Sequence, residues 1–261
     1  MSKKSTQPSY LDHFVFTKKT ACMQRIADLV RTGHHCYVRG VISLEKAGFL
    51  AAKFEAKFGI ERTKLEASRG RKHGESSTRL FMLKTVPESS ELEWILLHQP
   101  GDNQDASEKW RDALQDRIEL TGYELVRLVK PNEKNPVWTW RYSRTRHDEL
   151  RNSVVQAIRT RRDDELRQLI YMIWRTPGFY GGREQVKKFK ELVLGEWKRA
   201  SRSGKPDIPD RLGYVRRIAN KGARLSELRQ AETKAGRSRD VPGKGASDGL
   251  ESQFGLPDMP S

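Results

Sequence analysis

The sequence predicts an α+β protein: a ferredoxin-like (split βαβ) N-terminal domain, then a basic all-α helical domain and a disordered C-terminal tail. Between residues 34 and 143, segments rich in β-branched and aromatic residues alternate with segments of helical periodicity. From about residue 144 the apolar residues recur only at helical spacing. The end of the chain is Gly, Ser, Pro and charge, which cannot bury enough apolar surface to offset the cost of ordering. The predicted domains are therefore residues 1–143, 144–230 and 231–261.

The first domain is expected to begin with a leading helix over residues 17–31. The segment HHCYVRGVI then predicts a strand, because its residues are mostly β-branched or aromatic. Residues 44–58 carry apolar side chains at helical spacing and are followed by Gly59, a typical helix end. Residues 61–77 are expected to form a charged loop or a weak hairpin.

The rest of this domain supplies more strands and a second helix. TRLFMLKTV and ELEWILLHQ predict two strands, residues 107–120 predict a helix, and YELVRLV and VWTWRYS predict two further strands. After the leading helix, the order is β, α, β, β, α, β, plus one extra strand. That is the order of the split βαβ sandwich, with helices on one sheet face and the other face open. RRM-type modules stack bases on such an open face. An alternative interpretation takes residues 110–120 as a recognition helix and residues 123–142 as the wing of a winged helix.

The second domain is expected to be a small helical bundle. Three apolar stripes fall within residues 150–158, 166–174 and 186–197. A short fourth helix over residues 209–219 would complete the bundle.

The charge balance indicates a polyanionic partner. The chain has 50 Lys and Arg against 34 Asp and Glu, a formal net charge of +16, and a pI near 9.9. Residues 141–240 alone hold 26 basic and 13 acidic residues. Such an excess creates a field that concentrates nucleic acid.

The cysteine content and hydropathy predict a cytoplasmic protein with no membrane contact. Cys22 and Cys36 are the only cysteines, too few for a disulfide framework, and no signal peptide precedes them. No apolar run approaches the roughly 18 residues of a membrane span.

Motifs for cofactors and metals are missing from the sequence. There is no GxxxxGK[ST] phosphate loop, and no HExxH or paired CxxC appears. We therefore expect no cofactor and no metal site.

One histidine could support metal-independent RNA cleavage. The neighbours His34 and His35 would point to opposite faces of a strand, unlike the paired metal-binding histidines of rolling-circle initiators and relaxases. His35 with Tyr37 or Arg39 could instead supply a general acid and base, because alternate residues share a face. The competing interpretation is that these histidines pack at a strand edge or bind backbone phosphate.

Basic residues with aromatic neighbours indicate nucleic-acid contacts. SRGRKHG places Arg69, Arg71 and Lys72 on a Gly-rich loop suited to phosphates. In WTWRYSRTR, Trp138 and Trp140 share one strand face and alternate with polar and basic residues. These tryptophans stack bases if their face is open and only pack if it is the core face.

The stretch RTPGFYGGREQVKKF has two interpretations. The Gly181–Gly182 step, the free N–H groups of a new helix, and the adjacent Arg175 and Arg183 would form a phosphate-binding turn. Alternatively, Phe179 and its neighbour Tyr180 plug a helical hairpin, with glycines serving the turn geometry.

This stretch, followed by EWKRA, resembles segments of accessory proteins carried by proteobacterial plasmids and integrative conjugative elements, over about residues 165–200. The resemblance implies a setting in DNA replication, transfer or its control, and transfers no catalytic residue. The final FGLPDMPS resembles, in layout, the tails of bacterial single-strand-binding proteins, which dock an apolar tip into a protein partner. A frayed terminus is the alternative.

The sequence thus predicts a non-enzymatic nucleic-acid-binding protein of a bacterial mobile element. The alternatives are a metal-independent endoribonuclease, similar in outline to CRISPR repeat-processing proteins, and a scaffold that binds an acidic protein. The expected nucleic-acid-binding residues are Arg69, Arg71, Lys72, Trp138, Trp140, Arg141, Arg144, Arg175, Arg183, Lys187, Lys190, Lys198, Arg216 and Arg217.

Overall fold

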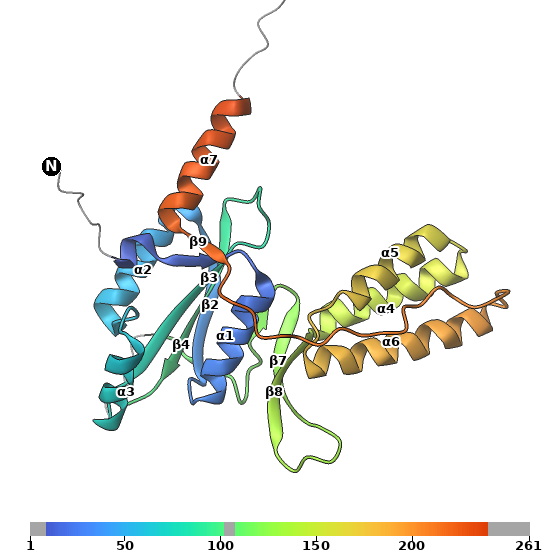
Figure 1. Ribbon diagram of the computed structural model, residues 1–261, viewed down its shortest axis with the longest axis horizontal. Helices are drawn as coiled ribbons and strands as arrows, with labels where there is room; N and C mark the ends of the chain where they lie inside the picture. The colour runs from blue at the N-terminus through green and yellow to red at the C-terminus, as the bar shows by residue number, and fades with distance from the viewer. Residues whose placement is uncertain (1–8, 102–107, 240–261) are drawn as a thin grey trace, which may run out of the picture.

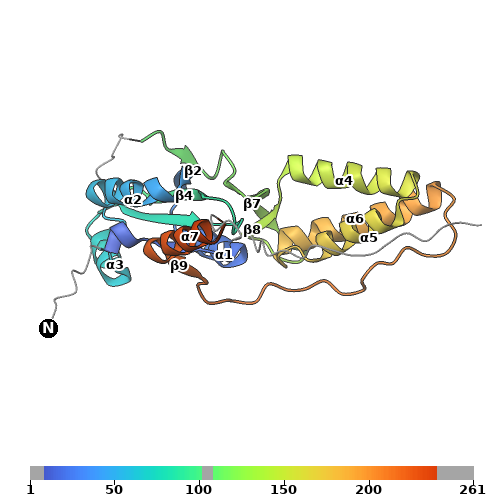
Figure 2. The same ribbon diagram turned by 90° about the horizontal axis from the view of Figure 1, so that it is seen from above.

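The computed structural model describes residues 9–101 and 108–239 and has a mixed α+β fold. A layered α/β unit lies at one end, and a helical extension projects from it (Figures 1 and 2).

A six-stranded mixed sheet forms the centre of the layered unit. Its strand order is β5 (Arg111–Asp112), β2 (Cys36–Ser43), β4 (Glu91–Gln99), β3 (Ser77–Leu83), β1 (Phe14–Phe16), β9 (Gly222–Arg224). The strands β2, β4 and β3 pair antiparallel, whereas β1 runs parallel to β3. The strand β9 joins β1 antiparallel, so the chain returns to this sheet after the helical extension.

Both faces of this sheet are covered. Helix α1 (Lys19–Arg31) shares a core with Phe81 and Leu83 on one face, while α2 (Leu44–Phe58) and α7 (Leu225–Arg239) pack on the face that holds Leu80 and Met82. The alternation along β3 sends successive side chains into different cores. The expectation of an open sheet face was therefore wrong.

The prediction of a charged loop or weak hairpin over residues 61–77 is also wrong for residues 64–72. Residues Lys64–Lys72 form helix α3. Thr63 caps this helix by accepting from the Glu66 backbone N–H, and the Glu66 carboxylate accepts from the Thr63 N–H. This capping box stabilises a segment that has too few apolar residues to show helical periodicity. The short 3-10 helix η1 (Ser9–Asp12) lies against α2.

A second, three-stranded sheet joins β6 (Glu119–Leu120), β7 (Tyr123–Val129) and β8 (Pro136–Tyr142) in that order. The predicted helix over residues 107–120 is wrong, because residues 108–120 contain only the short strands β5 and β6. Tertiary packing outweighs the helical spacing here: Trp110 stacks on His98 with ring centroids 4.6 Å apart, and Ile118 enters the core. Without that helix the split βαβ order is not confirmed, and the winged-helix alternative loses its recognition helix.

The extension consists of α4 (Arg144–Arg159), α5 (Asp163–Trp174) and α6 (Tyr180–Arg199). The expected fourth helix is absent. Residues 201–221, which we call the return segment, run back irregularly along the extension to β9 (Figure 2). Side chains fix its backbone: Trp174 Nε1 donates to Pro209 O at 2.9 Å, and Trp197 Nε1 donates to Gly204 O at 3.1 Å.

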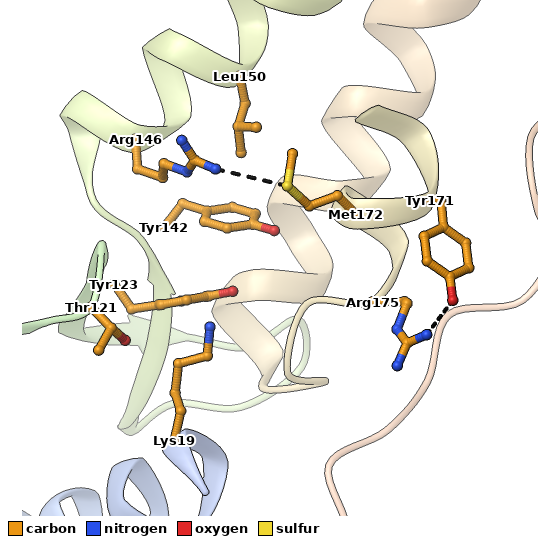
Figure 3. Close-up of a pocket in the computed structure, with 9 residues that line it drawn as sticks. All are labelled: Lys19, Thr121, Tyr123, Tyr142, Arg146, Leu150, Tyr171, Met172 and Arg175. Atoms are coloured by element: carbon orange, nitrogen blue, oxygen red, sulfur yellow. Dashed lines mark hydrogen bonds between the residues drawn. The ribbon is translucent and has the colours of Figure 1, made fainter. Parts of the chain in front are cut away.

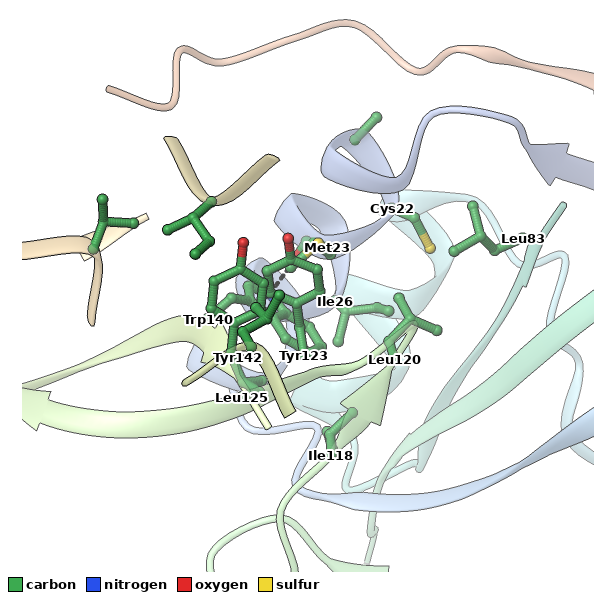
Figure 4. Packing of buried hydrophobic residues seen from close by; sticks show 14 of the residues in the cluster. Cys22, Met23, Ile26, Leu83, Ile118, Leu120, Tyr123, Leu125, Trp140 and Tyr142 are labelled. Atoms are coloured by element: carbon green, nitrogen blue, oxygen red, sulfur yellow. Dashed lines mark hydrogen bonds between the residues drawn. The ribbon is translucent and has the colours of Figure 1, made fainter. Parts of the chain in front are cut away.

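One hydrophobic core joins α1, the three-stranded sheet and the extension. Trp140 and Tyr142 of β8 pack with Met23 and Ile26 of α1 (Figure 4). Trp140 is completely buried, and its Nε1 donates to Met23 O at 2.8 Å. The extension is therefore packed on the layered unit rather than linked by a loop.

The C-terminal part of the described chain packs differently from the predicted division. Residues 222–224 extend the six-stranded sheet, and Arg229 of α7 donates to Leu44 O at 3.3 Å. Residues 231–239, expected to be disordered, continue α7. The rest of the predicted tail, with its FGLPDMPS tip, lies outside the described residues.

Candidate nucleic-acid interface

The start of α6 is a packing element. The backbone N–H of Gly181 donates to Thr139 Oγ1 at 2.9 Å, and a Cβ added at Gly181 would lie 3.0 Å from Trp140 O. The glycine step therefore allows α6 to begin directly against β8. The Val215 N–H donates to Gly178 O at 3.1 Å, so the return segment also crosses here. These contacts favour the plug over the phosphate-binding turn.

One side of α6 carries a row of cations, which we call the α6 cationic stripe: Arg183, Lys187, Lys190 and Lys198. At about 100° per residue these positions fall within roughly 80° of arc, along about 22 Å of helix. Lys187, Lys190 and Lys198 are exposed. Four residues expected to bind nucleic acid thus share one surface.

The stripe is only partly neutralised. Lys187 pairs with Glu184 at 2.7 Å, whereas Lys190 and Lys198 have no ion pair with any described residue. The Arg183 guanidinium lies 3.5 Å from the centroid of the Tyr214 ring, which the return segment contributes. Tyr214 is largely exposed, so an accessible aromatic side chain lies at the Arg183 end of the stripe.

A groove runs beside the stripe between α6 and the return segment. It has a volume of about 270 Å³, and Arg183, Lys187 and Lys190 line it together with Asp210 and Leu212. Three cations outnumber one carboxylate in this groove, so it favours an anion at its mouth.

The predicted cations of α3 form a separate surface. Arg69, Arg71 and Lys72 are exposed and have no ion pair among the described residues. Figure 1 places α3 in the layered unit, away from the extension that contains α6. A groove of about 550 Å³ that includes Arg69 is also lined by the carboxylates Glu55, Glu61, Glu66 and Glu75. This surface is consequently less cationic than the sequence stretch suggested.

The remaining predicted cations are scattered. Arg141 binds the buried Glu124 at 2.6 Å, and Arg217 binds Asp28 at 2.5 Å. Arg144 is 92% exposed at the start of α4, with Asp148 4.0 Å away. Arg216 is exposed on the return segment. None of these four residues lines the groove beside the stripe.

The two tryptophans expected to stack bases have different environments. Trp140 belongs to the core, and its complete burial rules out base stacking. Trp138 is half-buried, with the Arg127 guanidinium 5.7 Å from its ring centroid and the His35 ring 6.1 Å away. The packing interpretation therefore holds for Trp140.

The proposed acid–base group is not assembled. Tyr37 is buried and donates its hydroxyl hydrogen to Arg117 O at 3.1 Å, and Arg39 pairs with Glu119 at 3.1 Å. No hydrogen bond among the described residues joins His35 to Tyr37 or Arg39.

Two buried or half-buried titratable groups have structural roles. Burial lowers the pKa of His34 to about 4, and its Nε2 lies 3.2 Å from Ser77 Oγ. Hydrogen bonds from Arg199 and Arg159 lower the pKa of Glu196, which joins α4 to α6.

Sequence reasoning missed a second cationic cavity. Lys19 and Arg146 line it with the predicted Arg175 (Figure 3). No sequence signal marks this group, because 127 positions separate Lys19 from Arg146.

Within residues 9–101 and 108–239, no group of three or more His, Cys, Asp or Glu side chains is placed to hold a metal ion. None of the helices in this part of the chain combines the length and apolar character needed to cross a bilayer. Comparison of the chain with protein-family models, curated protein sequences and solved structures finds no significant match.

Proposed function

We propose that the protein binds nucleic acid non-enzymatically, through phosphate contacts made by the α6 cationic stripe. The observation that carries this proposal is the alignment of Arg183, Lys187, Lys190 and Lys198 along about 22 Å of one exposed helix side. Phosphates of one DNA strand follow one another at about 3.4 Å along the duplex axis, so such a row can contact several of them.

Charge and aromatic content support the same proposal. The extension and return segment, residues 144–221, carry most of the chain's excess positive charge, with 20 basic against 10 acidic residues. Tyr214 beside Arg183 offers a ring on which an unpaired base could stack. The setting we propose is the bacterial cytoplasm, in a plasmid or integrative conjugative element, from the resemblance of residues 165–200.

A pair of charge-matched triple variants tests the interface. The first replaces Lys187, Lys190 and Lys198 with Gln, and the second replaces Arg69, Arg71 and Lys72 with Gln. Each removes three positive charges. Fluorescence anisotropy with labelled single-stranded DNA, duplex DNA and hairpin RNA across a salt series gives the affinities.

The α6 variant should lose affinity and lower the salt-dependence slope on duplex DNA by up to about 2.7, at about 0.9 for each lost phosphate contact. The α3 variant should change the slope by much less. Equal losses in both variants would show that total charge, and not the stripe, drives binding. A denaturing gel of the RNA samples checks for cleavage, which the non-enzymatic proposal excludes.

A further inference from the structure

A cavity at the junction of the layered unit and the extension has the features of a ligand site. Its volume is about 400 Å³, within the ~300–1,000 Å³ range of small-molecule pockets. Its walls come from the start of α1, from the three-stranded sheet, and from α4 and the end of α5 (Figure 3). It lies apart from the groove beside the α6 cationic stripe, because the two share no lining residue.

The charge of this cavity is entirely positive. Lys19, Arg146 and Arg175 line it, and none of the Asp or Glu residues that the structure describes does. Arg146 pairs with Glu149 at 3.2 Å, whereas Lys19 and Arg175 have no ion pair among the described residues.

Lys19 is held in an unfavourable environment for a cation. Burial is the main cause that lowers its pKa, and the nearby Arg146 lowers it further, against a smaller opposing effect of Glu93. The positive charges of Lys19 and Arg175, which no ion pair among the described residues neutralises, favour an anion in this cavity, and a bound anion would offset the cost of burying Lys19.

Aromatic side chains complete the walls. Tyr123 and Tyr142 stack with ring centroids 4.9 Å apart, and Lys19 Nζ lies 4.7 Å from the Tyr123 centroid. Figure 3 shows Lys19 on one side of this pair and Arg146 on the other. At the rim, Tyr171 is 60% exposed and accepts a hydrogen bond from Arg175. Cations inside and an accessible ring at the mouth suit a ligand with a phosphate group and a planar base.

We propose that this cavity binds the phosphate of a nucleotide through Lys19 and Arg175, with the base against Tyr171. Arg146, on the other side of the tyrosine pair, adds to the positive field of the cavity. The phosphate can come from a free mononucleotide or from the 5′ end of a polynucleotide. The site does not depend on polynucleotide binding by the α6 cationic stripe, and its test separates the two.

The first experiment is isothermal titration calorimetry of the full-length protein with AMP, GMP, adenosine and inorganic phosphate. AMP or GMP should bind with a Kd of about 1 mM or tighter, and adenosine at least roughly tenfold more weakly. Absence of binding by either nucleotide at about 5 mM, together with equal affinity for oligonucleotides that carry a 5′ phosphate and a 5′ hydroxyl, would overturn the proposal. Equal affinities for AMP and adenosine would overturn the role of the phosphate.

Two variants locate the ligand. Lys19→Met keeps the packing on Tyr123 but removes the charge, and Arg175→Gln changes an exposed rim residue. Each should weaken nucleotide binding by roughly tenfold. Lys188→Gln serves as the control and should not weaken it, because Lys188 is an exposed cation outside both the cavity and the stripe. If Lys19→Met does not fold, Arg175→Gln decides. Unchanged nucleotide affinity in every folded cavity variant would refute the site.

Matched oligonucleotides with a 5′ phosphate or a 5′ hydroxyl distinguish the two sources. A preference for the 5′ phosphate that Arg175→Gln abolishes and the α6 triple variant retains identifies a polynucleotide end. Binding of AMP or GMP without such a preference identifies a free nucleotide. Failure of the α6 cationic stripe to bind DNA would leave these results unaffected.

Discussion

Trp140 provides a direct test of the junction between the layered unit and the extension. The variant Trp140→Phe removes the indole N–H that donates to Met23 O at 2.8 Å, and it replaces a fully buried indole with a smaller phenyl ring. Loss of the hydrogen bond should cost about 1 kcal/mol. A residual cavity of roughly 40 Å³, at about 24 cal/mol per Å³, adds about 1 kcal/mol. We therefore expect the free energy of unfolding to fall by about 2 kcal/mol.

Thermal unfolding followed by circular dichroism measures this loss. For a chain of this size, about 2 kcal/mol corresponds to a Tm roughly 4 to 8 °C lower. Trp138→Phe is the matched control, because Trp138 is half-buried on the same strand, and it should lose less than about 1 kcal/mol. Nucleic-acid affinity of the folded Trp140→Phe protein should not change. An unchanged Tm together with a tenfold loss of affinity would refute the reasoning and return Trp140 to a base-stacking role.

Three further outcomes follow from groups outside the junction. His34 is neutral in the folded state, with a pKa of about 4 against about 6.5 when unfolded, so its contribution to stability is present above pH 6.5 and is lost as the pH falls toward 4. This loss approaches roughly 3 kcal/mol. In urea denaturation, the free energy of unfolding of His34→Gln should therefore decrease less between pH 6.5 and 4 than that of the wild-type protein. Identical pH profiles for the two proteins would contradict the burial effect. Glu196→Gln should lower the free energy of unfolding, measured by urea denaturation at pH 7, by about 1 to 3 kcal/mol, because it weakens the charged hydrogen bonds from Arg159 and Arg199. Since the pKa of Glu196 is lowered, that difference should shrink as the pH falls below about 4, and a constant difference would point to packing instead. Gly178→Ala places a Cβ against the backbone at Gly213, so it should displace the return segment. Tryptic cleavage within residues 201–221 should then be faster. An unchanged cleavage rate would show that the return segment does not pack closely on Gly178.

Local sequence patterns predicted the long elements well. The strands β2, β3 and β4 lie in the β-branched runs, and α2 follows its apolar spacing up to Gly59, whose φ of 58° requires the left-handed region. Helix α3 was missed because it has too few apolar residues to show helical periodicity. The Thr63 and Glu66 capping box that begins it is a T-x-x-E pattern, and this pattern could have predicted the helix from the sequence.

Long-range packing accounts for the elements that the sequence did not predict. The spacing of Trp110, Leu114 and Ile118 fits a helix, but Ile118 is buried in the core, Trp110 stacks on His98, and Leu114 stays exposed. Three different environments for one apparent stripe cannot be inferred from spacing alone.

The candidate sites also differ in whether they depend on local spacing or on long-range packing. The α6 cationic stripe follows from helical spacing within one segment, so the sequence could place its residues on one side. The groove beside it depends on the return segment, whose path rests on Trp174 and Trp197 contacts. Lys19 and Arg146 line the same cavity only because the tertiary fold brings them together, so the sequence could not predict it.

The pairing of β1 with β9 sets the order in which the protein can be completed during synthesis. Phe14 pairs with Arg224, so the sheet closes only after the ribosome has made both the extension and the return segment. Until then β1 is an edge strand whose outer backbone groups are free to pair with another chain. Contacts of such long sequence separation form slowly, because the intervening loop must be ordered first. The nascent chain therefore carries an unpaired strand edge near its N-terminus for most of translation, and a chain that stops after α6 keeps that edge unpaired.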